Sequence, residues 1–253
     1  MSLTRVKCNP AFSSEPNNGA VSYVLNGQSS FNLIWDYNSA GEIVKDVYLY
    51  YVERGKDVLV AAKYFPGGQY YVYDAGYTNR VEFSGKATFT LKNIVPIDSQ
   101  WFKCVINFNT PPQVQGAITS INSAVEVVVV VRPSIIQQER LSSIELNEHD
   151  TKLLLCVASG NPKPSYTWKK NGAVIQQGQK SNYTITSAKK EDRGQYTCEA
   201  VVSVPELGFT RSASYTVDVK SPHGKMWSPK SVNKIFPSQR NTNQNFWSRD
   251  GKF

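Results

Sequence analysis

The sequence predicts an all-β protein made of two β-sandwiches in tandem, followed by a disordered tail. Three observations lead to this fold class. Short alternating or aliphatic runs, separated by turn residues, recur between residues 20 and 131. Cys156, Trp168 and Cys198 have the spacing of a sandwich core in the second half. A chain of 253 residues has room for two sandwiches of about 100 residues each and a short extension.

The first domain is expected to span residues 1–131 and to contain nine strands. The runs that predict them are Ala20–Leu25, Ser30–Tyr37, Asp46–Val52, Val58–Tyr64, Tyr70–Tyr73, Val81–Phe83, Ala87–Leu91, Trp101–Asn107 and Ser123–Val131. Each is short and bounded by residues that favour turns, as in antiparallel sandwiches.

The second domain is expected at residues 132–220. Trp168 lies twelve residues after Cys156, and Tyr196 lies two residues before Cys198. In a two-sheet sandwich such cysteines bridge strands B and F, the tryptophan of strand C packs on the bridge, and the tyrosine forms a corner hydrogen bond. These residues resemble an immunoglobulin domain of the intermediate (I) type, which implies a Cys156–Cys198 disulfide around a core of Trp168 and Tyr196.

The first domain resembles a variable (V) type immunoglobulin domain without two of its hallmarks. Nine strands are typical of that type. Trp35 takes the place of the strand B cysteine, and Leu49 takes the place of the strand C tryptophan. A core tolerates such an exchange of volume between strands if its total filling is kept. The V-type resemblance also implies a structural ion pair between Arg80 and Asp98.

The missing strand B cysteine leaves Cys104 without its usual partner. Cys8 is the other cysteine of this domain. A Cys8–Cys104 disulfide is one interpretation; two buried free thiols, or an intermolecular bond through Cys8, are the others. Sequence alone does not fix the Cα separation on which a disulfide depends.

A V-type domain of this kind followed by an I-type domain resembles the ectodomains of cnidarian allorecognition receptors. The resemblance covers residues 1–220. It implies polymorphic homophilic contacts between cells, made by the membrane-distal domain.

Aromatic residues supply the signal for a binding surface. Six aromatics occur among the fourteen residues from Tyr64 to Tyr77. That segment spans the predicted strands C′ and C″ and their turns. Because side chains alternate along a strand, the outward residues of the predicted strands C and F share one sheet face, formed by strands G, F, C and C′. Tyrosine-rich surfaces are common in protein interfaces, although cross-strand tyrosine pairs also occur on solvated sheets. The predicted interface residues are Tyr48, Tyr50, Val52, Tyr70, Tyr71, Tyr73, Trp101 and Val105.

The charge distribution argues against a nucleic-acid partner. The net charge is +8, but residues 221–253 carry six basic residues and one acidic residue. The two domains are therefore nearly neutral, and the basic tail is expected to be disordered. A secretory leader is not expected in Met1–Cys8, which carries charge but no apolar segment, and the longest aliphatic run, Val127 to Val131, is too short to cross a membrane.

Catalysis is not expected, and neither is a cofactor or metal. The two histidines, His149 and His223, are not placed beside a nucleophile or a metal-ligand cluster. Asn182-Tyr183-Thr184 is an N-glycosylation acceptor between the expected strands D and E of the second domain. The acceptor and the cysteines favour an extracellular or cell-surface protein.

The sequence therefore predicts a protein of cell–cell recognition or adhesion. Its partner is expected to be another immunoglobulin-domain protein or a second copy of itself. A soluble immune or pathogen-binding protein is one alternative. A structural module of an intracellular filament, with reduced cysteines and a bare Asn182, is another.

Overall fold

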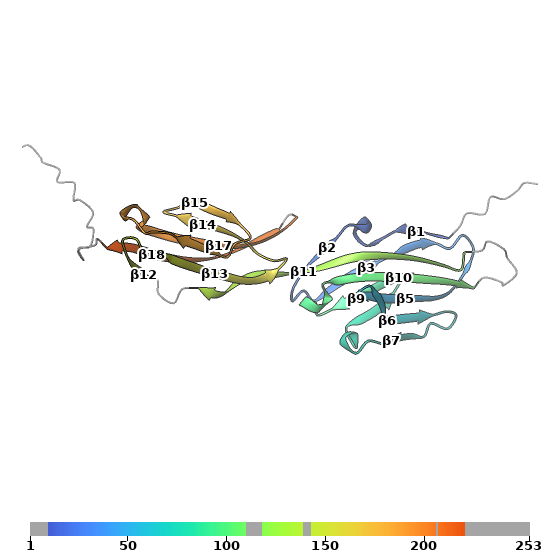
Figure 1. Ribbon diagram of the computed structural model, residues 1–253. Coiled ribbons are helices and arrows are strands. Elements are labelled where there is room, and N and C mark those ends of the chain that lie inside the picture. Colours follow the sequence, from blue (N-terminus) through green and yellow to red (C-terminus); the bar gives the residue numbers. More distant parts are fainter. Residues whose placement is uncertain (1–9, 110–117, 139–142, 206, 221–253) are drawn as a thin grey trace, which may run out of the picture.

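The computed structural model describes residues 10–109, 118–138, 143–205 and 207–220. Two immunoglobulin-like β-sandwiches lie end to end (Figure 1). Cys8 and the tail at 221–253 lie outside the described residues, so the predictions made for them are not tested. No helix in the described part of the chain is long and apolar enough to cross a membrane.

The first sandwich packs a six-stranded sheet against a three-stranded sheet. The larger sheet has the order β2-β11-β10-β5-β6-β7, the smaller has the order β3-β9-β8, and β1 pairs with β4. Strand β2 runs parallel to β11, while the other pairs are antiparallel. The strands are β1 (Ala11–Ser14), β2 (Ser22–Leu25), β3 (Ser30–Ile34), β4 (Asp36–Asn38), β5 (Ile43–Glu53), β6 (Lys56–Tyr64), β7 (Tyr70–Val72), β8 (Val81–Ser84), β9 (Thr88–Lys92), β10 (Gln100–Asn109) and β11 (Ser120–Gln138).

Trp35 interrupts the strand expected at Ser30–Tyr37 and divides it into β3 and β4. Its side chain is 1% exposed, and its indole Nε1 donates to Ser123 Oγ at 3.1 Å. Leu49 and Cys104 are fully buried and lie opposite each other in the pairing of β5 with β10. Trp35 and Leu49 thus both fill the core, as the sequence predicts.

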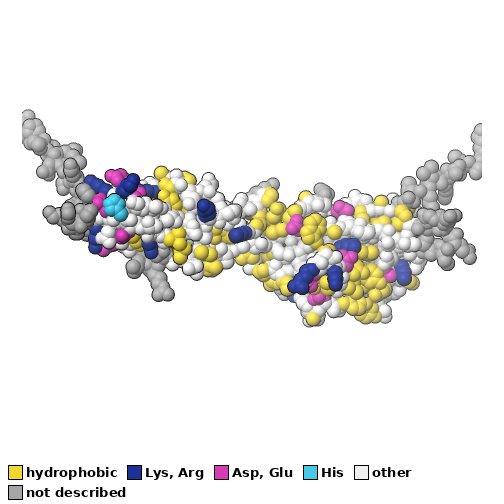
Figure 2. Space-filling view, in the orientation of Figure 1, with side chains coloured by type: hydrophobic (Ala, Val, Ile, Leu, Met, Phe, Trp, Pro, Cys, Tyr) yellow, Lys and Arg dark blue, Asp and Glu magenta, His cyan; other side chains and the backbone are white. Residues whose placement is uncertain are grey.

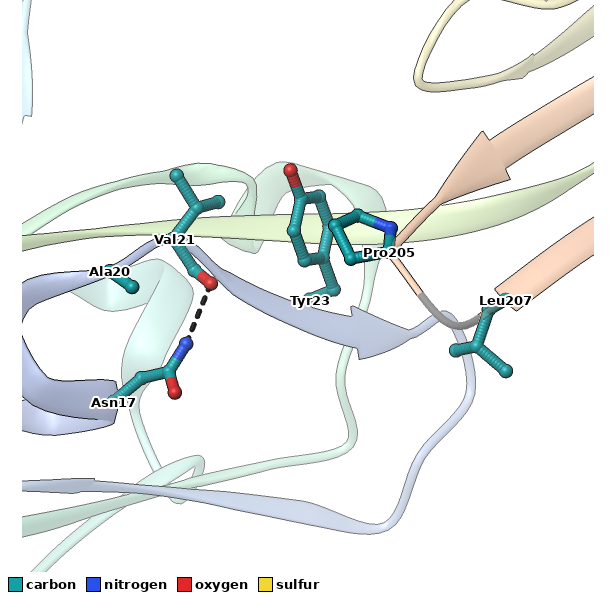
Figure 3. A pocket seen from close by; sticks show the side chains of 6 residues that line it. All are labelled: Asn17, Ala20, Val21, Tyr23, Pro205 and Leu207. Atoms are coloured by element: carbon teal, nitrogen blue, oxygen red, sulfur yellow. Dashed lines mark hydrogen bonds between the residues drawn. The ribbon is translucent and has the colours of Figure 1, made fainter.

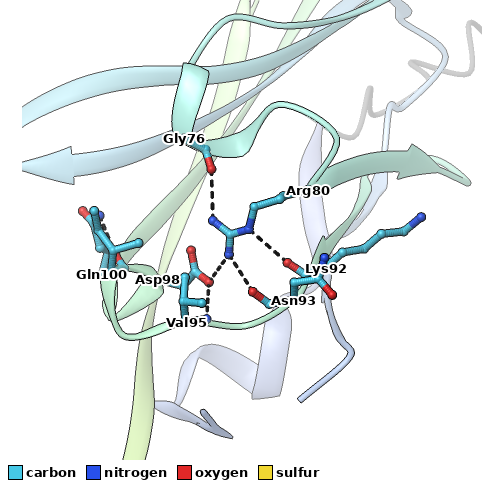
Figure 4. A network of polar contacts seen from close by, with 8 residues as sticks. Gly76, Arg80, Lys92, Asn93, Val95, Asp98 and Gln100 are labelled. Atoms are coloured by element: carbon cyan, nitrogen blue, oxygen red, sulfur yellow. Dashed lines mark hydrogen bonds and ion pairs between the residues drawn. The ribbon is translucent and has the colours of Figure 1, made fainter. Parts of the chain in front are cut away.

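Arg80 lies at the centre of a network of polar contacts in the first sandwich (Figure 4). It forms an ion pair with the buried Asp98 at 2.5 Å, as the V-type resemblance implies. Its other N–H groups donate to the backbone carbonyls of Gly76, Lys92 and Asn93. Because a buried carboxylate is costly unless it is paired, this network is structural.

The second sandwich packs β11-β13-β16 against β12-β18-β17-β14-β15. The Cys156–Cys198 disulfide joins the two sheets, with the Cα atoms 6.4 Å apart. Trp168 is fully buried, and the Tyr196 hydroxyl donates to the carbonyl of Asp192 at 2.8 Å, as a tyrosine corner does. The strands are β12 (Ser143–Asn147), β13 (Lys152–Asn161), β14 (Ser165–Lys170), β15 (Ala173–Gly178), β16 (Asn182–Ile185), β17 (Gly194–Val204) and β18 (Leu207–Lys220), with β12 parallel to β18.

The prediction that a strand D precedes Asn182 is wrong. Among residues 143–205, all of which are described, β16 follows β15 after three residues, and Asn182 is the first residue of β16. The connection is too short for a further strand, so β16 forms the edge of its sheet.

Strand β11 passes through the junction that the sequence places at residues 131–132. It pairs with β10 and β2 in the first sandwich and with β13 in the second. The Asn161 side chain of β13 donates to Val129 O at 2.7 Å and to Ser99 Oγ at 3.1 Å. A small apolar cluster also spans the junction, formed by Val130, Val202 and Val204 with Leu25 and Phe209 packed against it.

A pocket lies beside this junction, with residues of both sandwiches around it (Figure 3). Asn17 and Tyr23 come from the first sandwich, Pro205 follows β17, and Leu207 is the first residue of β18. The Asn17 side chain is held by donating to Val21 O at 2.8 Å.

Candidate protein-binding face

The outer face of the six-stranded sheet carries most of the residues predicted to bind a partner. On β5, Val47 and Leu49 are fully buried, whereas the alternate residues Tyr48, Tyr50 and Val52 are partly exposed on the other side. The pairing of β5 with β10 places Val105 opposite Tyr48 and Trp101 opposite Val52. Outward residues of both strands therefore share one surface, which we call the binding face.

Five tyrosines on this face form a continuous cluster, which we call the tyrosine cluster. Ring centroids are 5.9 Å apart for Tyr48 and Tyr50, 6.0 Å for Tyr48 and Tyr64, 6.0 Å for Tyr64 and Tyr71, and 6.3 Å for Tyr71 and Tyr73. The hydroxyls of Tyr64 and Tyr73 are hydrogen-bonded at 3.2 Å.

The rings remain accessible although they contact one another. Tyr71 is 45% exposed and Tyr73 is 52% exposed. Figure 2 shows hydrophobic side chains gathered over the part of the first sandwich where Figure 1 places β6 and β7. A contiguous apolar patch of this kind, rimmed by polar groups, is typical of an interaction site.

Polar groups flank the tyrosine cluster. Lys103 of β10 forms an ion pair with Asp57 of β6 at 2.7 Å, across the strand that carries Tyr50. Towards the other end, Asn107 Nδ2 donates to the buried Asp46 at 2.5 Å. Trp101, which is 48% exposed, lies on β10 opposite Val52, at the same end of the face as the Lys103–Asp57 pair.

The surroundings of Tyr50 and Tyr73 raise the pKa of both hydroxyls. Burial raises the pKa of Tyr50, and the carboxylates of Asp57 and Asp46 raise it further. The hydrogen bond to Tyr64 raises the pKa of Tyr73. A tyrosine hydroxyl can both donate and accept a hydrogen bond, so the cluster offers polar groups as well as ring surface.

The assignment of Tyr70 to this face is wrong. Tyr70 and Tyr71 are neighbours on β7, so their side chains point to opposite sides of the sheet. Tyr70 packs against the core, with its ring 6.1 Å from that of Phe83 and its hydroxyl donating to Val81 O at 3.1 Å. Burial raises its pKa above the ordinary range for tyrosine.

The interface prediction left out Tyr64, which contacts three other members of the cluster. Tyr64 is the first residue of the aromatic segment from Tyr64 to Tyr77. Its side could not be counted from the start of β6, because the pairing with β5 has a bulge between Leu49 and Tyr50.

No group of three or more His, Cys, Asp or Glu side chains in the described part of the chain is arranged to hold a metal ion. His149 lies at a turn with its ring nitrogen 3.3 Å from Ser187 Oγ. His223 lies outside the described residues.

Comparison with known sequences places an immunoglobulin domain in the second half of the chain. Residues 132–201 match the family model described as an immunoglobulin domain. The chain is 30% identical over 132 residues to protein turtle homolog B of Rattus norvegicus, which is 50% of this chain and 10% of that protein. It is 29% identical over 115 residues to lachesin of Drosophila melanogaster, which is 44% of this chain and 30% of that protein. The chain thus spans less than a third of the length of these relatives.

Solved structures share the tandem arrangement of the two sandwiches. The four N-terminal Ig domains of Dscam1 isoform 6.44 match with a TM-score of 0.58 and 20% identity, covering 84% of this chain and 46% of that one. A chain from the crystal structure of Dpr11 IG1 bound to DIP-gamma IG+IG2 matches with a TM-score of 0.55 and 18% identity, covering 83% and 99%. At 18–20% sequence identity, these similarities show that the chain has the same fold as these structures.

Proposed function

We propose that this chain acts outside the cell in recognition or adhesion, and that its first sandwich binds another immunoglobulin domain through the binding face. The observation that carries the proposal is the tyrosine cluster, with two of its five rings about half exposed. Tyrosine gives a large contact area for a small loss of side-chain entropy. A solved structure of similar fold also supports the proposal, because it is a complex between Ig domains, Dpr11 IG1 bound to DIP-gamma IG+IG2.

The finer proposal is that the partner is a second copy of this chain, as in the allorecognition receptors that the first domain resembles. A twofold contact brings one patch against itself, so the patch must be self-complementary. The tyrosine rings of the binding face lie beside one basic side chain, Lys103, and two acidic ones, Asp57 and the buried Asp46. Groups of both charge signs are therefore present for a second copy to contact, which supports a self-complementary patch.

The disulfide of the second sandwich makes the intracellular-filament alternative the weaker one. Structural disulfides form and persist in oxidising compartments and are rare in the cytosol. Cys156 and Cys198 form such a bond between the two sheets.

Replacing Tyr71 with aspartate tests the proposed contact. Tyr71 is 45% exposed, so the fold is expected to remain intact. Across a twofold axis the new carboxylate is buried twice within one contact, at a cost in desolvation and repulsion. We expect self-association, measured by sedimentation velocity and bead aggregation, to weaken at least about tenfold, which corresponds to roughly 1.4 kcal/mol.

The matched control is Ile34→Asp. Ile34 lies on β3 in the opposite sheet and is 49% exposed, so the same charge is added to a similar apolar position away from the binding face. This variant should associate like the parent. Equal association of the Tyr71 variant and the parent would exclude the binding face, and a parent that stays monomeric at high concentration would exclude a homophilic contact in favour of a different ligand.

A further inference from the structure

A row of aliphatic side chains lies on the solvent side of the second sandwich. Along β13, Leu154 and Cys156 are fully buried, so the alternate residues Leu153, Leu155 and Val157 point outward. Leu153 is 44% exposed. An antiparallel sheet that faces water normally has polar residues at such positions. We call these three residues the leucine row.

The neighbouring strand β11 extends this apolar surface. Ile136 is 66% exposed and is the extra residue of a bulge, between Ile135, which pairs with Ala158, and Gln137, which pairs with Val157. Ile135, one residue earlier, packs against the core. Ile136 therefore lies on the solvent side, next to the leucine row.

The glycosylation acceptor lies directly against the leucine row on its other side. In the pairing of β13 with β16, Asn182 is opposite Leu155 and Thr184 is opposite Leu153. Tyr183 between them points inward, with its ring 6.1 Å from Trp168 and 5.9 Å from Tyr196. The two acceptor residues therefore project from the same face as the leucines.

Strand β16 is also an open edge. In the described part of the chain its one strand partner is β13, and the Gln176 side chain donates to Asn182 O at 2.7 Å from the opposite sheet. Unpaired edges next to apolar surface invite pairing with other chains, and proteins usually cover or charge them. A bulky polar group at Asn182 would protect both features.

We propose that Asn182 carries an N-linked glycan whose first sugars lie over the leucine row and shield the edge of β16. The pairing of β13 with β16 supports this proposal, because it places Asn182 opposite Leu155 in the leucine row. Sugar rings have one face of C–H groups that packs on aliphatic side chains, while their hydroxyls remain in water. The glycan thus replaces exposed apolar surface by polar surface.

The attachment is a transfer from a lipid-linked oligosaccharide diphosphate in the secretory pathway. The bond between C1 of the first N-acetylglucosamine and the diphosphate oxygen breaks, and a bond from C1 to Asn182 Nδ2 forms. The amide nitrogen loses one proton, and the lipid diphosphate leaves with the bonding electrons. The inference rests on the proposed function only in requiring secretion, and it does not depend on the partner bound by the first sandwich.

The first experiment tests the modification. The full chain is secreted from eukaryotic cells behind an added leader, as wild type and as the variants Thr184→Ser and Thr184→Ala. Serine keeps the acceptor motif and alanine removes it, while both shorten the same exposed side chain. We expect peptide N-glycosidase F to lower the mass of the wild type and of the serine variant but not of the alanine variant. A wild-type mass that the enzyme does not change would overturn the assignment.

The second experiment tests what the glycan covers. Enzyme-treated protein should bind the hydrophobic dye ANS several-fold more strongly than untreated protein, and Leu153→Ser should remove this increase. Equal dye binding before and after treatment would show that the glycan does not lie on the leucine row. Self-association that is sensitive to Tyr71→Asp is measured on the same samples, so failure of the glycan proposal and failure of the binding-face proposal are distinguishable.

Discussion

The two tryptophans that are buried in the described part of the chain stabilise their sandwiches in different ways. Trp35 stands where a cysteine would bridge the sheets, and it links them by packing and by a hydrogen bond to Ser123 at 3.1 Å. Trp168 packs in the core that also contains the Cys156–Cys198 bond, with its ring 6.2 Å from that of Tyr215. One large indole thus takes over the place of the covalent link in the first sandwich.

Replacing Trp168 with alanine should destabilise the second sandwich by about 3–5 kcal/mol, the usual cost of emptying a large core position. The first sandwich has a separate core and should be unaffected. Differential scanning calorimetry should show one transition lowered and one unchanged. Val174→Ala, at a position 58% exposed on β15, is the control and should leave both transitions in place. An unchanged profile for the Trp168 variant would contradict the role of this residue in the core.

Cys104 allows a test of the open disulfide question in the first sandwich. Its thiol is buried and has no disulfide partner among the described residues, while Cys8 lies outside them. Burial raises the pKa of the Cys104 thiol, which disfavours the reactive thiolate, and also keeps reagents from the sulfur. We expect iodoacetamide to leave Cys104 unlabelled in the native protein and to label it in guanidinium without reductant. If labelling in guanidinium appears only after reduction, Cys104 is disulfide-bonded, and peptide mapping would then identify Cys8 as its partner or exclude it.

At the scale of strands, the sequence predicts local features well and edges poorly. Alternation predicts the inward Leu49 and outward Tyr50 of β5, and motif spacing predicts the Cys156–Cys198 bond. Tyr70 was misplaced because a three-residue strand contains too little alternation to show which side faces water. Strand D was expected by analogy, and the three residues that connect β15 to β16 exclude it.

Strand β11 shows a second limit of sequence reasoning. Residues 131–134 contain a proline and a charged residue and lie at the boundary that the sequence predicts between the two domains. In the structure β11 continues through them, because each sandwich offers a partner strand, β10 on one side and β13 on the other. Pairing across a domain boundary depends on contacts distant in sequence, and local patterns do not contain that information.

At the scale of the whole molecule, the junction is expected to hold the two sandwiches at a fixed angle. Strand β11, the Asn161 hydrogen bonds and the apolar cluster around Val202 all cross it. Removing two of these links with Asn161→Ala and Val202→Ala should broaden the range of bend angles. Small-angle X-ray scattering should then give a shorter average maximum dimension, with an unchanged circular dichroism spectrum.

The control for this prediction is Lys163→Ala with Ser203→Ala. Both residues are exposed neighbours of the junction positions on the same loop and strand. This pair should scatter like the parent. If both double variants give the same curve as the parent, the side-chain contacts do not set the angle and the continuous strand alone is sufficient.

The parallel pairs in each sandwich determine how the molecule would bear a mechanical load. Strand β2 is parallel to β11 in the first sandwich, and β12 is parallel to β18 in the second. In each pair one strand lies near the entry of the chain into the sandwich and the other leads to its exit. Tension between the two ends of the molecule therefore pulls the members of each pair in opposite directions, so that their hydrogen bonds are sheared together rather than opened one after another. A tether between two cell surfaces built from such units would resist separation through whole ladders of bonds, and β11 would carry the force from one unit to the next.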